Sequence, residues 1–280
     1  MNIDFIGIGA QRTGTSWVYA CLYEHPDICA PVKEIHFFSR PRYAEGLAWY
    51  EAHFKRCGEG KKKGEFSTSY LYDEHTPARI HQSYPETKIV AILRNPIARA
   101  YSQYGNDIKA GTIPETCSFE EHYRTDKSVL EQGRYAEQLK RYEALFPHTH
   151  MLVLIHEDAR KDPQAYIQSI YRFLEVDDTF VPSMLYDTIN NTRVPKYIGV
   201  ERGMHVCAEF LRKSGFDRLV HGVRRLGIPN VVRAINTKKE KKDAHPYDRA
   251  PLIAYFKDDV AELSRMLKRD LTREWGMMDI

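Results

Sequence analysis

A short apolar run followed by two spaced glycines opens the chain, and this feature limits the possible fold most. Residues 4–8 are mostly aromatic or β-branched, so they predict a strand that begins almost at the N-terminus. Gly9 and Gly14 then flank a loop, and residues 14–24 have the apolar spacing of a helix. Glycines let successive backbone N–H groups converge, and the N-terminus of a helix favours an anion. The order strand, loop and helix therefore predicts an α/β fold with a phosphate-binding loop.

The loop differs in its cation from the form found in nucleotide hydrolases. That form has Lys after the second glycine, followed by Ser or Thr. Here Thr15 stands at the lysine position, and the cation of the loop is Arg12. The alternative is a chance pair of glycines at a strand-to-helix turn. The place of the loop directly after the first predicted strand favours the phosphate cradle.

Further strands alternate with helices along the chain. Apolar runs at residues 88–93 and 151–155 predict strands buried on both faces, as in a parallel sheet. Helical patterns cover residues 97–109, 133–146, 163–174, about 201–226 and 251–268. The alternation predicts an α/β fold with a central parallel sheet flanked by helices. Neither an internal repeat nor a low-complexity linker interrupts the chain, which favours a single domain over residues 1–280.

A second anion site is indicated where the strand at residues 88–93 ends. Arg94 follows this strand, and ligands of open α/β sheets bind at the carboxyl ends of strands. Ser102 lies in the second turn of the next predicted helix, and a guanidinium with a hydroxyl suits a phosphate monoester. An equally good interpretation pairs Arg94 with a structural acid.

Charge and composition exclude several classes of protein. The net charge of +3 is too small to indicate a nucleic-acid partner. Residues 193–242 carry 13 Lys and Arg against 4 acids, a block that is either a solvated surface or the face of an anionic ligand. No apolar run approaches the roughly 20 residues of a membrane span, and the N-terminus lacks the basic and apolar regions of a secretion signal. We therefore expect a cytoplasmic protein.

The five cysteines are scattered and form no CxxC pair. This spacing predicts neither a zinc site nor a disulfide framework. Free thiols in a reducing compartment are the expectation.

Three ordered segments resemble motifs of sulfotransferases that use 3′-phosphoadenosine-5′-phosphosulfate (PAPS). Residues 9–16 resemble the 5′-phosphosulfate loop of this family, and residues 92–102 resemble its 3′-phosphate motif. Residues 33–38 look like the segment that carries the catalytic glutamate in the heparan sulfate sulfotransferase branch. The resemblance runs from Phe5 to about Leu174 and implies a three-layer P-loop fold of the nucleotide-hydrolase type.

The resemblance also implies roles for individual residues. Glu34 would be the general base, and Arg94 with Ser102 would hold the 3′-phosphate. Lysines before a His-Pro pair contact the nucleotide in this branch, which points to Lys241 and Lys242. The loop residues that would hold the 5′-phosphosulfate are Arg12, Thr13, Gly14, Thr15 and Ser16.

Two positions depart from the family pattern. Arg12 replaces a lysine that is frequent in the loop, which keeps the charge but changes its geometry. Phe66 stands where the heparan branch has a second lysine, and this argues against a heparan-type acceptor more than against sulfuryl transfer.

The chemistry of sulfuryl transfer assigns a task to each residue. Glu34 would take the proton of the acceptor hydroxyl, and Arg12 with the loop amides would neutralise the leaving phosphate. His36, which shares a face with Glu34 in an extended segment, is a candidate for acceptor binding or for the base itself. Tyr70 and Tyr135 are candidates for the acceptor cleft, although a place in the core is an equally good interpretation.

The sequence therefore predicts an enzyme that transfers a sulfuryl group from PAPS to a hydroxyl and releases adenosine 3′,5′-bisphosphate. A sugar, a phenol, a lipid or a small-molecule alcohol would suit as acceptor, and no metal is required. The first alternative is a P-loop kinase for a small molecule, because phosphate loops serve both classes. The second is a non-catalytic module that binds a nucleotide or polyanion. The oligomeric state stays open.

Overall fold

The computed structural model describes residues 1–39, 41–186, 194–195, 237–238 and 247–278. Two compact units share the chain: one joins Met1–Ile189 to His245–Ile280, and the other is Asn190–Ala244. The described part of the second unit is an antiparallel pair, β6 (Val194–Pro195) with β7 (Thr237–Lys238). The helix predicted at residues 201–226 lies outside the described residues. A single domain over residues 1–280 stays a prediction.

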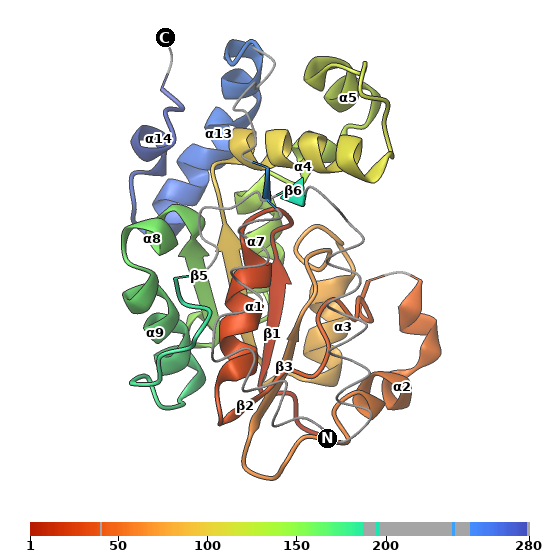
Figure 1. Cartoon of the computed structure of the whole chain (residues 1–280), viewed down its shortest axis with the longest axis vertical. Helices are drawn as coiled ribbons and strands as arrows, with labels where there is room; N and C mark the ends of the chain where they lie inside the picture. The colour runs from red at the N-terminus through yellow and green to blue at the C-terminus, as the bar shows by residue number, and fades with distance from the viewer. Residues whose placement is uncertain (40, 187–193, 196–236, 239–246, 279–280) are drawn as a thin grey trace. The chain divides into compact units, whose positions relative to one another are not determined.

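A five-stranded parallel sheet forms the centre of the first unit (Figure 1). The strand order is β2-β3-β1-β4-β5, so the first strand pairs on both sides. Ile6 of β1 lies opposite Glu65 of β3 and Ile89 of β4. The strands are β1 (Phe5–Gly9), β2 (Ile28–Cys29), β3 (Lys62–Phe66), β4 (Lys88–Leu93) and β5 (Met151–Ile155). The predicted central parallel sheet is confirmed.

Alternate residues of the sheet pack into two hydrophobic cores. In β4, Ile89 and Leu93 belong to one core and Val90 and Ile92 to the other, as the two-residue period of a strand requires. Burying a side chain of this size contributes about 1.5–3 kcal/mol. The second core contains residues of α1 (Thr15–Glu24) and α9 (Pro163–Leu174). The first contains residues of α3 (Thr76–Ser83), α4 (Pro96–Ala110), α7 (Tyr135–Glu143) and α13 (Ala250–Leu267). Helices therefore cover both faces of the sheet.

Shorter helices connect these elements. They are α2 (Leu47–Ala52), α5 (Phe119–Thr125), α6 (Ser128–Glu131), α8 (His156–Lys161) and α14 (Leu271–Glu274), with 3₁₀ turns at Arg42–Glu45 and His148–His150. Within the described ranges, no helix combines the length and the apolar character needed to cross a membrane.

The parallel arrangement gathers the segments that follow the strands at one edge of the sheet. The phosphate loop follows β1, and Arg94 follows β4. Glu34 and His36 come after β2, and Ser67 follows β3. These are the residues around which the candidate site is built.

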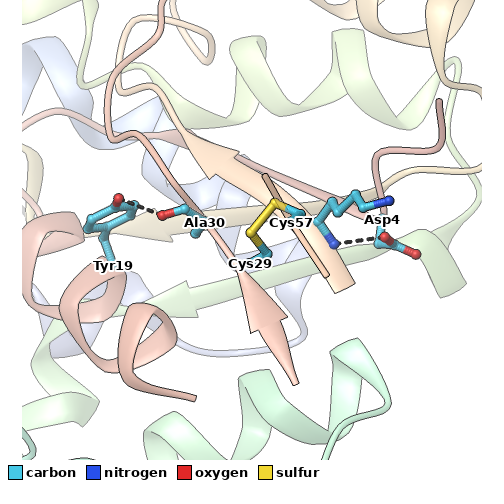
Figure 2. Close-up of a disulfide and its surroundings, with 6 residues drawn as sticks. Asp4, Tyr19, Cys29, Ala30 and Cys57 are labelled. Atoms are coloured by element: carbon cyan, nitrogen blue, oxygen red, sulfur yellow. Dashed lines mark hydrogen bonds between the residues drawn. A yellow bond between two sulfur atoms is a disulfide. The ribbon is translucent and has the colours of Figure 1, made fainter. Parts of the chain in front are cut away.

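The expectation of free thiols is wrong for two cysteines, because Cys29 and Cys57 form a disulfide (Figure 2). Cys29 ends β2 beside β3, and Cys57 lies in the loop that leads into β3, so their Cα atoms come within 5.7 Å, a distance that a disulfide can bridge. Cys21 and Cys117 are free. Cys207 lies outside the described residues. The pairing escaped prediction because it depends on contacts between segments 28 residues apart.

Candidate active site

The phosphate loop turns sharply between β1 and α1. Arg12 and Gly14 have positive φ values of 68° and 87°, and the hydroxyl of Thr13 donates to the carbonyl of Ala10 at 2.7 Å. The first N–H groups of a helix have no partner within the helix, so the start of α1 offers donors to an anion. A side chain at position 14 would bring its Cβ within 2.8 Å of Nδ1 of His156. Both the backbone conformation and this close approach require glycine here.

Arg12 joins the loop to helix α4. Its Nε donates to Oγ of Ser102 at 3.3 Å, and its Nη1 donates to Oδ1 of Asn106 at 3.0 Å. Arg94 in turn donates from Nη1 to the carbonyl of Arg12 at 3.3 Å. The two anion sites predicted separately from the sequence are therefore adjacent, and the guanidinium of Arg12 links them through its bonds to α4.

Burial of these cations favours an anionic ligand. Burial lowers the pKa of Arg12, and the pKa of Arg94 is lowered by burial and then by Arg160. For both cations burial disfavours the charged form, and for Arg94 the like charge of Arg160 adds to this cost. An anion bound between Arg12 and Arg94 would offset both costs.

His156 is a residue of this region that sequence reasoning missed. It is the first residue of α8, directly after β5, and it packs against the phosphate loop at Gly14. Burial, followed by Arg94 and Arg160, lowers its pKa to about 4, so the ring is neutral at pH 7. Its place directly after an apolar strand was the signal that could have identified it.

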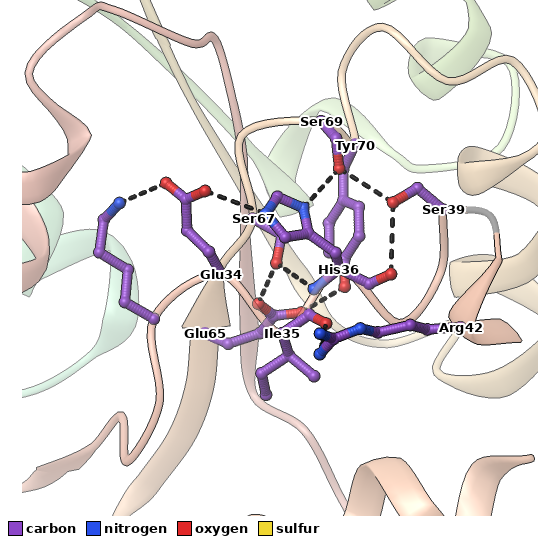
Figure 3. A network of polar contacts seen from close by, with 10 residues as sticks. Glu34, Ile35, His36, Ser39, Arg42, Glu65, Ser67, Ser69 and Tyr70 are labelled. Carbon is purple, nitrogen blue, oxygen red and sulfur yellow. Dashed lines mark hydrogen bonds and ion pairs between the residues drawn. The ribbon is translucent and has the colours of Figure 1, made fainter. Parts of the chain in front are cut away.

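Glu34 and His36 form a pair at the same edge of the sheet (Figure 3). Oε2 of Glu34 lies 3.0 Å from Nε2 of His36, and Oε1 pairs with Lys33. The hydrogen bond with His36 lowers the pKa of Glu34 to about 2, and Lys33 acts in the same direction against the effect of burial. The side chain of Glu34 keeps 34% of its surface exposed. Glu34 thus offers an ionised, accessible carboxylate.

A fully buried carboxylate lies beneath this pair. Glu65 in β3 accepts hydrogen bonds at 2.6 Å from the hydroxyls of Ser67 and Tyr70. Ser67 in turn accepts the backbone N–H of His36 at 2.9 Å. Figure 3 shows that these side chains converge on the segment between residues 34 and 39.

Other predicted residues lie away from solvent or outside the described ranges. Tyr70 and Tyr135 are fully buried, as the core interpretation requires, and a place in the acceptor cleft stays a prediction. Phe66 packs into the core against Phe5 and Gly7, where a Cβ on Gly7 would come within 2.0 Å of its ring. Lys241 and Lys242 lie outside the described residues. In the part of the chain that the structure describes, no group of three or more His, Cys, Asp or Glu could hold a metal ion.

Comparison with known proteins gives matches that all name sulfotransferases. A family model described as "Sulfotransferase domain" matches residues 2–217. Heparan sulfate glucosamine 3-O-sulfotransferase 6 from Homo sapiens is 32% identical over 173 residues, which cover 60% of this chain and 50% of the relative. Bifunctional heparan sulfate N-deacetylase/N-sulfotransferase 3 from Homo sapiens is 29% identical over 193 residues, 61% of this chain and 22% of the relative. The chain thus spans about half the length of the first relative and less of the second.

A solved structure extends the likeness over nearly the whole chain. The sulfotransferase from Alicyclobacillus acidocaldarius superposes with a TM-score of 0.70 at 25% identity, covering 99% of each chain. Its match supports the arrangement of a parallel sheet flanked by helices described above.

Proposed function

This chain belongs to the sulfotransferase domain family, and we propose that it transfers a sulfuryl group from PAPS to an acceptor hydroxyl. Two contacts carry the proposal: Arg12 donates to Ser102, and Arg94 donates to the carbonyl of Arg12. Because of these contacts, the phosphate loop and the first turns of α4 form a single cationic region. A donor with phosphate groups at both its 5′ and 3′ positions suits such a region. ATP lacks the 3′-phosphate.

Donor binding divides between the loop and helix α4. The amides at the start of α1, with Thr13, Thr15 and Ser16, hold the 5′-phosphosulfate, since a helix N-terminus attracts anions. Arg94 and Ser102 hold the 3′-phosphate. The roles of Lys241 and Lys242 toward the nucleotide stay part of this proposal, on the family resemblance alone.

The chain's own groups account for the transfer step. Glu34 takes the proton from the acceptor hydroxyl as that oxygen forms its bond to sulfur. The bond between sulfur and the phosphate oxygen breaks, and Arg12 with the loop amides stabilises the charge that grows on the leaving phosphate. Glu34 is ionised and partly exposed, so it can receive the proton, and the contacts with His36 and Lys33 that keep it ionised also make it a weaker base. His36, in contact with Glu34, is the alternative base or a group that binds the acceptor.

A sugar hydroxyl is the acceptor class that the relatives favour. Their names state glucosamine of heparan sulfate as the group that is sulfated, and their likeness covers 60% of this chain. Labelled sulfate in PAPS should be offered with a glucosamine oligosaccharide, a phenol and a long-chain alcohol. Transfer to the oligosaccharide supports this class, and transfer only to the phenol or alcohol contradicts it.

The compartment stays a proposal. The sequence predicts a cytoplasmic protein, whereas the disulfide between Cys29 and Cys57 is more typical of oxidising compartments.

Arg94→Ala should weaken binding of adenosine 3′,5′-bisphosphate about tenfold to a hundredfold, because a charge-assisted contact contributes about 1.5–3 kcal/mol. Calorimetry with this ligand and with adenosine 5′-phosphate measures the contribution of the 3′-phosphate. Arg172→Ala, which removes an exposed guanidinium paired with Asp178, is the matched control and should bind as wild type. A folded Arg94→Ala variant that discriminates the two ligands as well as wild type would show that the 3′-phosphate lies elsewhere.

Turnover should be the same with and without a chelator of divalent metals. The phosphate loop lacks the lysine that reaches the β- and γ-phosphates of ATP, and PAPS brings its own leaving group. The rate of release of adenosine 3′,5′-bisphosphate, measured with EDTA and then with added Mg²⁺, checks this. Activity that vanishes with EDTA and returns with Mg²⁺ would favour the small-molecule kinase instead.

A further inference from the structure

We propose that the buried carboxylate of Glu65 is a positioning residue, which fixes the backbone of the segment that carries Glu34 and His36. The inference rests on the proposed function, because sulfuryl transfer is one of its readouts. Glu65 has no exposed surface, so its action passes through its hydrogen-bonded neighbours.

The direction of the hydrogen bonds around Glu65 is determined by its charge. An ionised carboxylate only accepts hydrogen bonds, so the single protons of the Ser67 and Tyr70 hydroxyls must both point to it. The two hydroxyl oxygens are then left to accept. Ser67 accepts the backbone N–H of His36 at 2.9 Å, and Tyr70 accepts that of Phe38 at 3.4 Å.

The segment held in this way has a backbone conformation that needs support. Glu34 and His36 have positive φ values of 62° and 55°, which cost a residue other than glycine about 1–3 kcal/mol. The backbone N–H of Glu34 is tied to the carbonyl of Phe66 at 2.7 Å, directly beside Glu65. Through Ser67 and Tyr70, Glu65 thus helps to fix the backbone of this strained segment at His36 and Phe38.

The side chain of His36 transmits this placement to Glu34. Its Nδ1 lies 2.7 Å from Oγ of Ser69, and its Nε2 lies 3.0 Å from Oε2 of Glu34. A shift of the His36 backbone would therefore turn the ring and displace the carboxylate of Glu34. Figure 3 shows this path from Glu65 through Ser67 and His36 to Glu34.

The charge of Glu65 changes near neutral pH. Burial raises the pKa of Glu65 to about 7, against hydrogen bonds from Ser67 and Tyr70 that lower it. The titratable groups that face it are His36 in the loop after β2, Tyr70 after β3, Tyr50 of α2 and Tyr19 of α1. Protonation turns one carboxyl oxygen into a donor, so one of the two hydroxyls must reverse. The support is present above pH 7 and is lost as the pH falls through that value.

Glu65→Gln tests the proposal, because Gln keeps the size of the side chain but must donate one of its two hydrogen bonds. We expect kcat to fall about tenfold, the effect of one misdirected hydrogen bond. The Kd for adenosine 3′,5′-bisphosphate should stay within about twofold of wild type, and the fall of kcat between about pH 8 and pH 6 should disappear. The assay uses the acceptor of the three-compound panel that wild type turns over.

Tyr70→Phe and Tyr171→Phe form a matched pair, since each removes the hydroxyl of a fully buried tyrosine. The hydroxyl of Tyr70 serves Glu65 and Phe38, whereas that of Tyr171 donates to the carbonyl of Cys21 in the other core. We expect Tyr70→Phe to lower kcat and Tyr171→Phe to leave it unchanged. If Glu65→Gln fails to fold, this pair decides the question.

Hydrogen exchange of the peptide covering residues 33–39 gives a readout that needs no activity. We expect Glu65→Gln to speed exchange there and to leave β4 protected. The positioning role is overturned if wild type is active and Glu65→Gln leaves kcat and the pH profile unchanged. It is also overturned if Glu65→Gln leaves the hydrogen exchange of residues 33–39 unchanged. Equal losses of kcat and donor affinity, with faster exchange throughout, overturn it in favour of a general structural role. A wild type without transfer contradicts the proposed function, and the exchange result then still decides the role of Glu65.

Discussion

Glu34→Gln should lower the turnover number by about 10²–10⁴, the usual contribution of a general base. Gln keeps the size of the side chain and most of its hydrogen bonding but takes no proton from the acceptor. The affinity for adenosine 3′,5′-bisphosphate should stay nearly unchanged, because Glu34 contacts Lys33 and His36 rather than the phosphate loop. Steady-state rates with a slow acceptor, for which chemistry limits turnover, provide the measurement.

Titration of Glu34 itself should not change this loss between about pH 5 and 8. Because the hydrogen bond with His36 lowers the pKa of Glu34 to about 2, its carboxylate stays ionised throughout this window and protonates only far below it. Protonation of Glu65 displaces the carboxylate of Glu34 in wild type, whereas the variant has no base to displace, so the ratio of the two rates should shrink below about pH 7. Glu262→Gln, which alters a partly exposed carboxylate paired with Lys140, is the matched control and should be fully active.

Two other results would assign the base differently. If His36 is the base, His36→Gln should show the large loss and Glu34→Gln a milder defect in binding. A Glu34→Gln variant within a few-fold of wild type, under conditions where chemistry limits the rate, would remove Glu34 from the mechanism.

Loss of the disulfide between Cys29 and Cys57 should lower the free energy of unfolding by about 3–4 kcal/mol. The bridge joins residues 28 apart, and closing a loop of this length restricts the unfolded chain. The loop contains Glu34 and His36. Urea unfolding of wild type with and without reductant, and of a variant with both Cys29→Ser and Cys57→Ser, measures the effect.

The reduced wild type and the double variant should agree in stability. Cys117→Ser, which changes a free and partly exposed thiol, should leave the unfolding midpoint unchanged. Mass spectrometry that finds Cys29 and Cys57 as free thiols in the purified protein would contradict the pairing, and so would a double variant as stable as wild type.

Local sequence patterns were sufficient to predict the strands and the helix around which the donor site is built. The strand and helix around Gly9 and Gly14, the strand β4 and the strand β5 each combine an apolar run with a clear stop or start. Asn95 illustrates this, since its side chain accepts the N–H of Ala98 and caps α4 directly after β4. Arg94 was found because it follows such a strand.

The acceptor side of the site was harder to predict. β3 reads Lys62-Lys63-Gly64-Glu65-Phe66, which is too polar to indicate a strand between β1 and β2. Hydrogen bonds from the hydroxyls of Ser67 and Tyr70 help to satisfy the buried oxygens of Glu65 there. A contact of this kind depends on how the loop and the strand pack in three dimensions, and no local sequence pattern predicts it. The same holds for His156 at the phosphate loop and for the partner of Cys29.

The most direct test of sulfuryl transfer uses PAPS that carries radioactive sulfate and measures where the radioactivity goes. The purified chain should move the label to an acceptor of the panel and release adenosine 3′,5′-bisphosphate in equal amount. Adenosine 5′-phosphosulfate, which lacks the 3′-phosphate, should serve far less well, and ATP with Mg²⁺ should not phosphorylate the acceptor. Phosphorylation of an acceptor by ATP, with PAPS left intact, would contradict the account.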